Sequence, residues 1–283
     1  QRITSSKLVK SGKAVLTAQC PLVNPIISSE AEIITSINSS RDTLQIWAME
    51  EVDSLSLIIS DVSGLNDTLK LRYFKKRGRQ SRETFMKTNI KATFPYYDSI
   101  RIRFTNPIDS VLRPNELVYI KTATDSFFTS LCFDSVMLNA TVAVNLVPDT
   151  SYSIIIPGNT LVDIYGNKND TLILKTKVDK PSDYGAIKIN LESPYAGNQY
   201  IVQILSDKDK LVAESIGTPG VYTFPNLVAD TYKVRVIADS NGNTKWDAGN
   251  YWQGKQSEPV YYLPKAIELR SNWDIEETFS LAE

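Results

Sequence analysis

The residues whose types and spacing could support chemistry in this chain lie between positions 239 and 247. Asp239, Asn241 and Asn243 occupy alternate positions, and Asp247 follows four residues after the last of them. Calcium prefers six to eight oxygen ligands, which a tight loop supplies from alternate positions. The spacing therefore predicts a structural calcium loop, in which these four side chains and the main-chain carbonyl of Lys245 provide the oxygen atoms.

Two positions of this loop depart from a strong calcium site. Thr244 stands at the sixth place, where glycine is usual, and Asn250 stands at the twelfth instead of a bidentate glutamate. With two carboxylates, we expect a dissociation constant of about 10⁻⁴ to 10⁻³ M, as in extracellular modules. In the alternative interpretation, the Asn and Asp side chains cap their own backbone as Asx turns and bind no ion. Both interpretations stay open.

Aromatic residues follow this loop closely. Trp246, Tyr251 and Trp252 are flanked by Asn and Gly and are candidate ligand-binding residues, because Trp and Tyr dominate binding surfaces. The alternative is that these rings pack a small core. Strand alternation assigns Tyr261 and Trp273 to that core.

Catalysis has little support in the sequence. The chain has no His, which removes the commonest general base, the Ser-His and Cys-His pairs and the usual catalytic zinc ligands. Neither a Gly-x-Ser-x-Gly elbow nor a phosphate-binding glycine loop occurs. The pairs Glu50-Glu51 and Glu276-Glu277 are adjacent, so in strands their side chains point to opposite faces. We expect no enzyme activity and no catalytic residues.

Composition limits the class of protein. The chain has 283 residues, 42% hydrophobic and 22% charged, which suits two or three globular domains. A net charge of −1 gives no field that would recruit nucleic acid. No apolar run approaches the roughly 20 residues that span a bilayer. Cys20 and Cys132 stand far apart in apolar contexts and are interpreted as buried, reduced thiols.

Short runs rich in Val, Ile, Thr, Tyr and Phe recur between Asn, Asp, Gly and Pro, which predicts an all-β chain of tandem antiparallel sandwiches with little or no helix. The first two segments repeat one plan, and both close on Asn-Asp-Thr-Leu. The predicted pairs of equivalent strands are Lys13 to Ala18 with Ser99 to Phe104, Thr43 to Ala48 with Thr141 to Val144, Ser54 to Ile59 with Ser151 to Ile156, and Asn66 to Tyr73 with Asn169 to Lys175.

We predict three domains, at residues 1–92, 93–179 and 180–283. The basic run at 75–82 lies between the first two. It is interpreted as a solvated linker, with a patch for an anionic polymer as the alternative.

Two strings in the second segment carry a family resemblance. They are Ile102-Arg103-Phe104-x-x-Pro107-Ile108 and Asp163-x-Tyr165-Gly166-Asn167-x-x-Asp170-Thr171-Leu172. The segment resembles the bacterial Ig-like domains of surface-layer proteins and secreted lipoproteins, and residues 5–75 resemble them more weakly. This resemblance implies non-catalytic spacers or binding modules.

The third segment contains Phe224-x-x-Leu227-x-x-x-Thr231-Tyr232-x-Val234 and resembles prealbumin-like or carboxypeptidase-regulatory-like sandwiches. Such adhesin repeats carry a similar Asx-rich string that binds calcium. The whole chain is similar to bacterial outer-surface lipoproteins, which implies export to the outer membrane, cell surface or periplasm. We expect an export or lipid-anchoring segment upstream, a scaffold or adhesion role, and protein or glycan partners. The alternative is a carbohydrate-binding protein with its site on the third segment.

Seven Asp-Ser/Thr-aliphatic tripeptides resemble an O-glycosylation sequon of exported proteins in some gut bacteria. Their hydroxyls belong to Thr43, Ser54, Thr68, Ser99, Ser110, Ser135 and Thr171. The alternative is that these pairs simply begin strands after turns.

Overall fold

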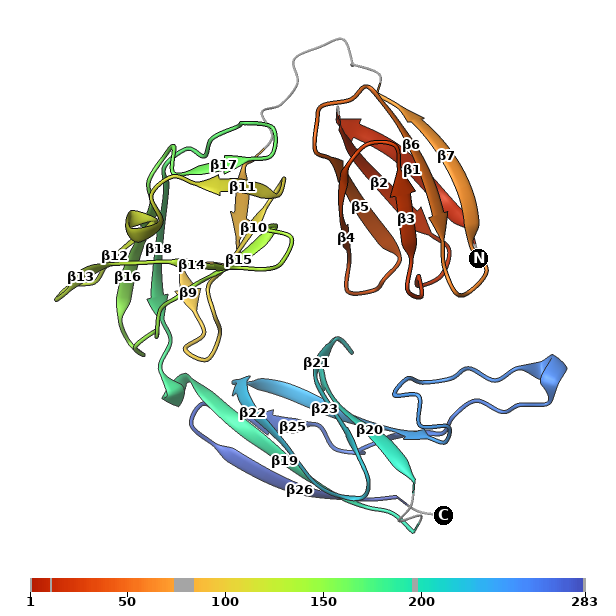
Figure 1. The fold of residues 1–283 in the computed structure, drawn as a ribbon. Helices are drawn as coiled ribbons and strands as arrows, with labels where there is room; N and C mark the ends of the chain where they lie inside the picture. Colours follow the sequence, from red (N-terminus) through yellow and green to blue (C-terminus); the bar gives the residue numbers. More distant parts are fainter. Residues whose placement is uncertain (1, 11, 74–83, 195–197, 282–283) are drawn as a thin grey trace. The chain divides into compact units, whose positions relative to one another are not determined.

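The computed structural model describes residues 2–10, 12–73, 84–194 and 198–281, so the basic run at 75–82 lies outside the described residues. The chain divides into two compact parts, Gln1–Val178 and Asp179–Glu283. The first part contains two sandwiches, and the second part contains the third sandwich, which we also call the third unit. It is an all-β protein (Figure 1) whose described helices are the short 3-10 turns η1 (Pro114–Glu116), η2 (Pro181–Asp183) and η3 (Tyr251–Gln253). None of the helices described is long and apolar enough to cross a membrane.

The first sandwich has the strand order of a constant-type Ig domain. One sheet runs β1-β2-β5-β4 and the other β3-β6-β7, all antiparallel. Lettered in chain order, these are the ABED and CFG sheets. The bounds are β1 Ile3–Lys10, β2 Lys13–Ala18, β3 Ile26–Ser29, β4 Ile33–Ile37, β5 Thr43–Ala48, β6 Ser54–Ser60 and β7 Asn66–Arg72.

The second sandwich keeps the same order and adds strands. One sheet runs β8-β10-β15-β14, and the other runs β9-β18-β16-β12-β13, with β9 parallel to β18. A separate pair joins β11 to β17. The bounds are β8 Met86–Thr88, β9 Thr93–Phe94, β10 Arg101–Phe104, β11 Ile108–Val111, β12 Val118–Lys121, β13 Ser126–Thr129, β14 Leu131–Phe133, β15 Asn139–Val142, β16 Ser151–Ile156, β17 Leu161–Asp163 and β18 Leu172–Val178.

The predicted strand equivalences are therefore correct. β2 corresponds to β10, β5 to β15, β6 to β16 and β7 to β18, which gives the B, E, F and G strands of both sandwiches. Several boundaries differ. β15 is Asn139–Val142 and not Thr141 to Val144, β10 begins at Arg101 and not at Ser99, and β18 begins at Leu172 and not at Asn169. Asn169 is instead a buried loop residue whose Oδ1 accepts hydrogen bonds from the main-chain N–H groups of Thr160 (3.0 Å) and Leu161 (2.9 Å).

In the third sandwich the first and last strands pair with each other in parallel. Its first strand, β19, lies between β22 and the last strand, β26, to which it runs parallel. The other sheet runs β21-β20-β23, and β24 and β25 both pair with β23. The bounds are β19 Tyr184–Glu192, β20 Gln199–Ser206, β21 Leu211–Gly217, β22 Gly220–Val228, β23 Asp230–Asp239, β24 Val260–Tyr262, β25 Ile267–Leu269 and β26 Asp274–Ser280.

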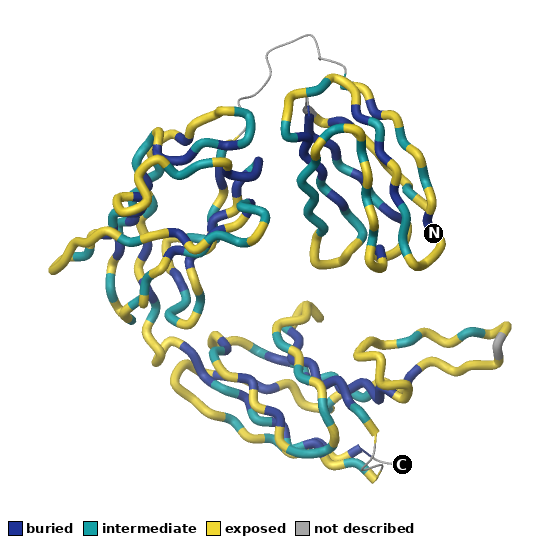
Figure 2. The backbone as a smooth tube through the Cα atoms, in the orientation of Figure 1, coloured by how far each residue is buried: buried dark blue, intermediate teal, exposed yellow. Residues whose placement is uncertain are grey.

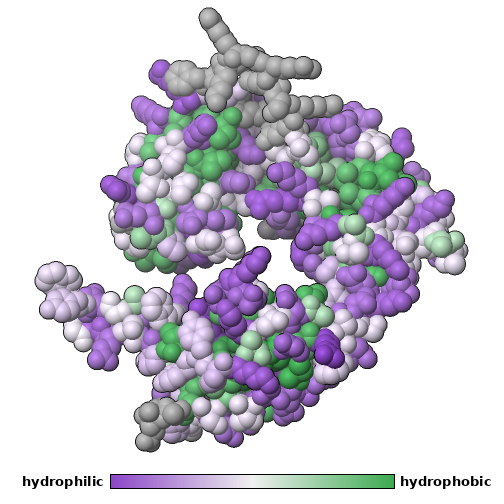
Figure 3. Space-filling model, turned by 180° about the vertical axis from the view of Figure 1, so that it is seen from behind, coloured by the Kyte–Doolittle hydropathy of each residue, from purple (hydrophilic) through white to green (hydrophobic). Residues whose placement is uncertain are grey.

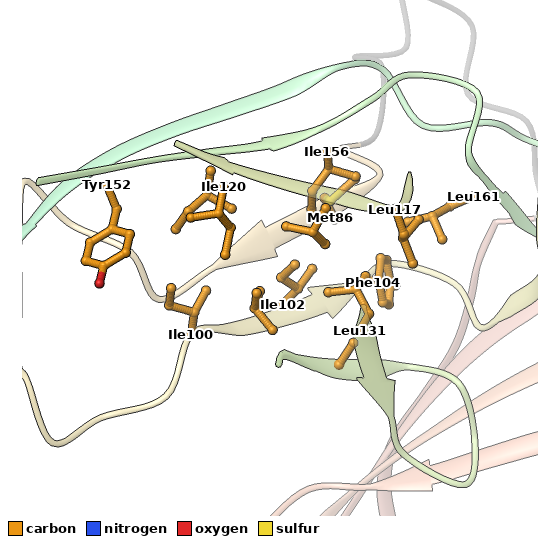
Figure 4. Close-up of a cluster of buried hydrophobic side chains, with 14 of the residues drawn as sticks. Met86, Ile100, Ile102, Phe104, Leu117, Ile120, Leu131, Tyr152, Ile156 and Leu161 are labelled. Carbon is orange, nitrogen blue, oxygen red and sulfur yellow. The ribbon is translucent and has the colours of Figure 1, made fainter. Parts of the chain in front are cut away.

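Each sandwich has its own hydrophobic core, with buried residues between 8 and 71, between 86 and 178, and between 187 and 281. Alternation explains them: in β10, Ile102 and Phe104 point inward, whereas Arg101 and Arg103 are exposed. Figure 4 shows Ile100, Ile102 and Phe104 facing side chains of the opposite sheet. Figure 2 shows the same alternation of buried and exposed positions along the strands.

The predicted burial of the cysteines is wrong. Cys20 and Cys132 are both exposed, with no disulfide between them. Cys132 is the middle residue of β14, and because Leu131 is buried, strand alternation turns the next side chain outward. Cys20 follows the end of β2 in a bend, where the alternation of the strand no longer applies.

The second core offers a direct test of this assignment. Ile102→Ala removes a fully buried side chain and is expected to lower the free energy of unfolding by about 2–5 kcal/mol. Ile173→Ala, on the exposed face of β18, is the control and should change it by less than about 0.5 kcal/mol. Denaturant unfolding of the full chain measures both, and equal effects would contradict the assignment of faces.

Candidate functional site

The candidate site is a long excursion between β23 and β24. We call residues 240–259 the arm, because they leave the third sandwich as a narrow projection (Figures 1 and 3). Its outer part is a two-stranded ribbon in which Asn250 and Lys255 exchange main-chain hydrogen bonds of 2.8 and 3.0 Å. A β-carbon on Gly249 would lie 2.9 Å from the main-chain nitrogen of Ser257, so a glycine there allows the two sides to approach.

Asp239 fixes the start of the arm. It is the last residue of β23 and is only 2% exposed. Its two carboxylate oxygens accept the main-chain N–H groups of Asn243 (3.1 Å) and Thr244 (2.8 Å). Since a buried carboxylate is costly without hydrogen bonds, this pairing explains why the chain turns back immediately after the strand.

The next Asx residues form a chain of caps. Asn241 Oδ1 accepts the N–H of Asn243 (3.0 Å), and Asn243 Oδ1 accepts the N–H of Lys245 (2.9 Å). Their side-chain amides, Asn241 Nδ2 and Asn243 Nδ2, both donate to Asp247 Oδ2, the second at 2.8 Å. Lys255 Nζ lies 3.9 Å from the same oxygen. The four predicted ligand side chains are therefore brought together in one small loop.

Glu258 completes the base of the arm, and the sequence analysis missed it. It is 5% exposed, and its carboxylate accepts the N–H groups of Ser240 (2.9 Å) and Asp247 (3.0 Å). Its carbonyl accepts the indole N–H of Trp246 at 3.2 Å. Glu258 thus ties the outgoing side of the arm to the returning side. It lies eleven residues beyond Asp247, outside the spacing of a loop motif.

These residues suit calcium in type and in place, but their oxygen atoms are engaged in capping the backbone. Among the residues described, no three His, Cys, Asp or Glu side chains gather as a metal site. The two amides that meet Asp247 present nitrogen, and a half-turn of either would set that nitrogen against the main-chain N–H group that its oxygen now accepts.

The far end of the arm carries the most exposed aromatic residues of the described chain. Tyr251 is 91% exposed and Trp252 is 93% exposed, and they lie in η3 at the turn of the ribbon. Their ring centroids are 5.9 Å apart with an interplanar angle of 78°. Trp246 is half exposed and braces the base of the arm. The three aromatic candidates thus lie at opposite ends of the arm.

The other two aromatic assignments have different outcomes. Tyr261 packs partly buried against the core of the third unit, as alternation predicts. Trp273 is exposed and its predicted burial is wrong, because it precedes β26 and stacks under Arg270, 5.0 Å from the ring centroid.

Of the seven sequon hydroxyls, those of Ser54, Thr68, Ser99, Ser135 and Thr171 belong to exposed residues.

Comparison with known proteins adds little. No protein family matches the chain, and no curated protein matches it. Three solved structures with some likeness can be named. The N-terminal part of the bacterial S-layer protein SbsC shares 13% identity over 63% of this chain and 43% of its own, with a TM-score of 0.29. BcpA, the major pilin subunit of Bacillus cereus, shares 9% over 92% and 94%, with a TM-score of 0.24. Bacteroides ovatus SGBP-B, in complex with a mixed-linkage heptasaccharide, shares 10% over 80% and 66%, with a TM-score of 0.26. Our chain spans less than half of the SbsC fragment, and likeness this low carries no argument about function.

The role of Glu258 is testable through stability. Glu258→Ala leaves the part-buried N–H groups of Ser240 and Asp247 without an acceptor and is expected to lower the free energy of unfolding of the third unit by about 2 kcal/mol. Glu258→Gln keeps one acceptor and should cost less. Thermal unfolding of the full chain measures both, with Glu268→Ala as the control, because Glu268 is the exposed residue of β25. If Glu258→Ala changed the stability no more than the control does, Glu258 would not hold the two sides of the arm together.

Proposed function

We propose that the chain is a non-catalytic, exported interaction module whose two Ig-like sandwiches act as spacers and whose third unit contacts a partner through the arm. The observation that carries this proposal is the tip, where two neighbouring aromatic side chains are more than 90% exposed. Exposed Tyr and Trp are characteristic of binding hot spots. Residues 240–259 are also held by buried carboxylates, so the tip is presented by a preorganised element. We further propose that the protein acts at the cell surface or in the periplasm, attached to the membrane by a lipid anchor.

The partner proposed is a protein. The two tip rings are nearly perpendicular, so they do not form the flat double platform on which a linear glycan stacks. A perpendicular pair suits insertion of each ring into a separate hollow of a protein surface. The second candidate is a glycan that stacks on Trp252 alone, which the exposure of this single ring favours.

Truncation of the tip tests this proposal. Trp252→Ala and Tyr251→Ala are each expected to weaken saturable binding to surface proteins of the source cell by about 30-fold, the usual loss at a hot spot of 2 kcal/mol. Neither variant should change the unfolding midpoint, since both rings lie in solvent. Trp273→Ala, an exposed tryptophan away from the arm, is the control.

A glycan array with the same three variants separates the candidates. Binding to glycans that Trp252→Ala abolishes and Tyr251→Ala spares would establish the glycan interpretation. If all three variants still bind both surface proteins and glycans as the unaltered chain does, the tip has no role in binding. Turnover of a glycoside or peptide would contradict a non-catalytic module.

We also propose that calcium orders the base of the arm, held by Asp239, Asn241, Asn243, Asp247 and the carbonyl of Lys245. A bound ion would add positive charge beside Asp239 and Asp247, where Lys255 Nζ now lies 3.9 Å from Asp247 Oδ2. Calcium at about 100 times its dissociation constant should stabilise the native form by roughly 2.7 kcal/mol and raise the thermal midpoint of the third unit. Asp247→Asn should remove this shift, while Asp274→Asn on β26 should keep it. A midpoint that is equal in calcium and in chelator would leave the loop as a self-capped turn.

A further inference from the structure

The second sandwich has an exposed edge strand that none of the sites above includes. β13 is the outermost strand of its sheet as the structure describes it, next to β12. Figure 1 shows the hairpin of β12 and β13 projecting from the sandwich. Its turn is held by Thr122, whose main-chain N–H donates to the carbonyl of Asp125 at 2.9 Å. The outer side of β13 therefore presents main-chain N–H and C=O groups in a defined conformation, and such groups pair most readily with another strand.

This edge lacks the charges, proline and bulges with which native proteins protect edge strands. Residues 126–133 contain no charged residue, Pro or Gly. The pairing of β13 with β12 is regular along its whole length, from Val118 opposite Thr129 to Lys121 opposite Ser126. By contrast, the edge strands β1 and β21 contain the charged residues Lys7 and Glu214. The sequence of β13 therefore permits a further strand to pair with it.

Two adjacent aromatic side chains lie on opposite faces of this edge. Phe128 lies opposite Tyr119 on the outer face, with ring centroids 5.0 Å apart, and it is 52% exposed. Phe127 lies opposite the buried Ile120, yet it stays 39% exposed at the edge of the sheet. A strand added next to β13 would cover both rings, since successive side chains of a strand point to opposite faces. The partner that fits is an extended segment with uncharged side chains on both faces.

The chain itself supplies a strand of this kind. When two copies pair antiparallel, the two-fold axis is perpendicular to the sheet and passes between a residue and its own equivalent, so side chains of the same face meet. With Phe128 at the axis, its ring lies opposite Phe128 of the second copy, and Phe127 lies opposite Thr129. Ser126 then lies opposite Ser130. Aromatic–aromatic, aromatic–β-branched and hydroxyl pairs of this kind favour strand pairing. With Phe127 at the axis, Phe128 would lie opposite Ser126, which is a poorer match.

We propose that β13 pairs antiparallel with β13 of a second copy, with Phe128 at the two-fold axis. Tyr119 and Phe128 of both copies then form a row of four rings on the outer face. Each copy uses its edge once, so the assembly closes as a dimer. About five residues of each copy take part, against roughly 20–30 in a standard interface, so we expect a weak dimer with a dissociation constant of about 10⁻⁴ M. The contact lies in the second sandwich and does not depend on the partner of the arm.

Sedimentation velocity of the full chain tests this proposal at about 5 to 500 µM, a range that brackets the expected dissociation constant. A reductant keeps Cys20 and Cys132 as thiols. Phe128→Glu and Phe128→Lys each place like charges opposite one another at the axis and should weaken the dimer by at least about 30-fold. A mixture of the two variants places opposite charges there and should restore the dimer to within about tenfold of the unaltered chain. Ile173→Glu, on similarly exposed β18 surface of the same sheet, is the matched control and should leave the dimer unchanged.

Hydrogen exchange locates the contact. Exchange of the main chain at 126–130 should slow with rising concentration in the unaltered chain but not in Phe128→Glu. The unfolding midpoints are measured alongside, and if a charged variant unfolds, the exchange of the unaltered chain decides the outcome. A chain that stays monomeric at about 500 µM would overturn the proposal. So would a dimer that Phe128→Glu retains, a mixture that associates no more than its components, or assemblies larger than a dimer.

Discussion

Buried carboxylates organise the loops of this protein. The main-chain N–H and C=O groups of the strands pair with those of neighbouring strands. The segments between strands have no such partners, so other groups must accept hydrogen bonds from their main-chain N–H groups. Asp163, Asp239 and Glu258 are the three buried acids of the described chain, and each accepts at least two such N–H groups. Because an unpaired buried charge is costly, each carboxylate fixes the one loop conformation that surrounds it with donors. The turn after β17 and the arm are both built on these residues.

The arm illustrates how such a constraint leads to function. The arm has 20 residues and buries little apolar surface. If it were held only at its two ends, fixing it in one conformation would cost much conformational entropy. Glu258 and Asp239 tie its base, and the cross-strand bonds between Asn250 and Lys255 hold its outer part. Its tip can therefore expose Tyr251 and Trp252 in a defined arrangement. A rigid contact element loses less entropy on binding than a mobile one, which favours affinity without added area.

Regular strands could be predicted from the sequence, and short ones could not. Runs of six or more alternating residues, such as Lys13–Ala18 and Ser151–Ile156, were placed correctly because their inward positions are apolar. The strands β9 and β17, of two and three residues, are too short to show a period and form only through pairing with their neighbours. The start of β18 was misplaced because Asn169 belongs to a loop that its own side chain caps. Spacing in the sequence singled out Asp239, Asn241, Asn243 and Asp247 as a group. Glu258 could not be found in this way, because it contacts Ser240 and Asp247 from the returning side of the arm.

The strand order explains why such different sites can occur on one plan. In the first two sandwiches the same B, E, F and G strands form the core, while the loops at their ends vary. Asp163 is the last residue of β17 and Asn106 lies just before β11, so the pairing of these two strands brings them side by side. The first sandwich has no counterpart of that pair among its described strands. In the third unit β23 continues into the arm, so its final residue, Asp239, is both a strand end and the first cap. Sites on a rigid strand end are held more precisely than sites on a loop alone, since the strand ladder fixes the main chain on one side. The turn at Asp163 and the arm after Asp239 thus both begin where a strand ends in a buried carboxylate. The sheets can stay unchanged while the segments that follow these strand ends differ.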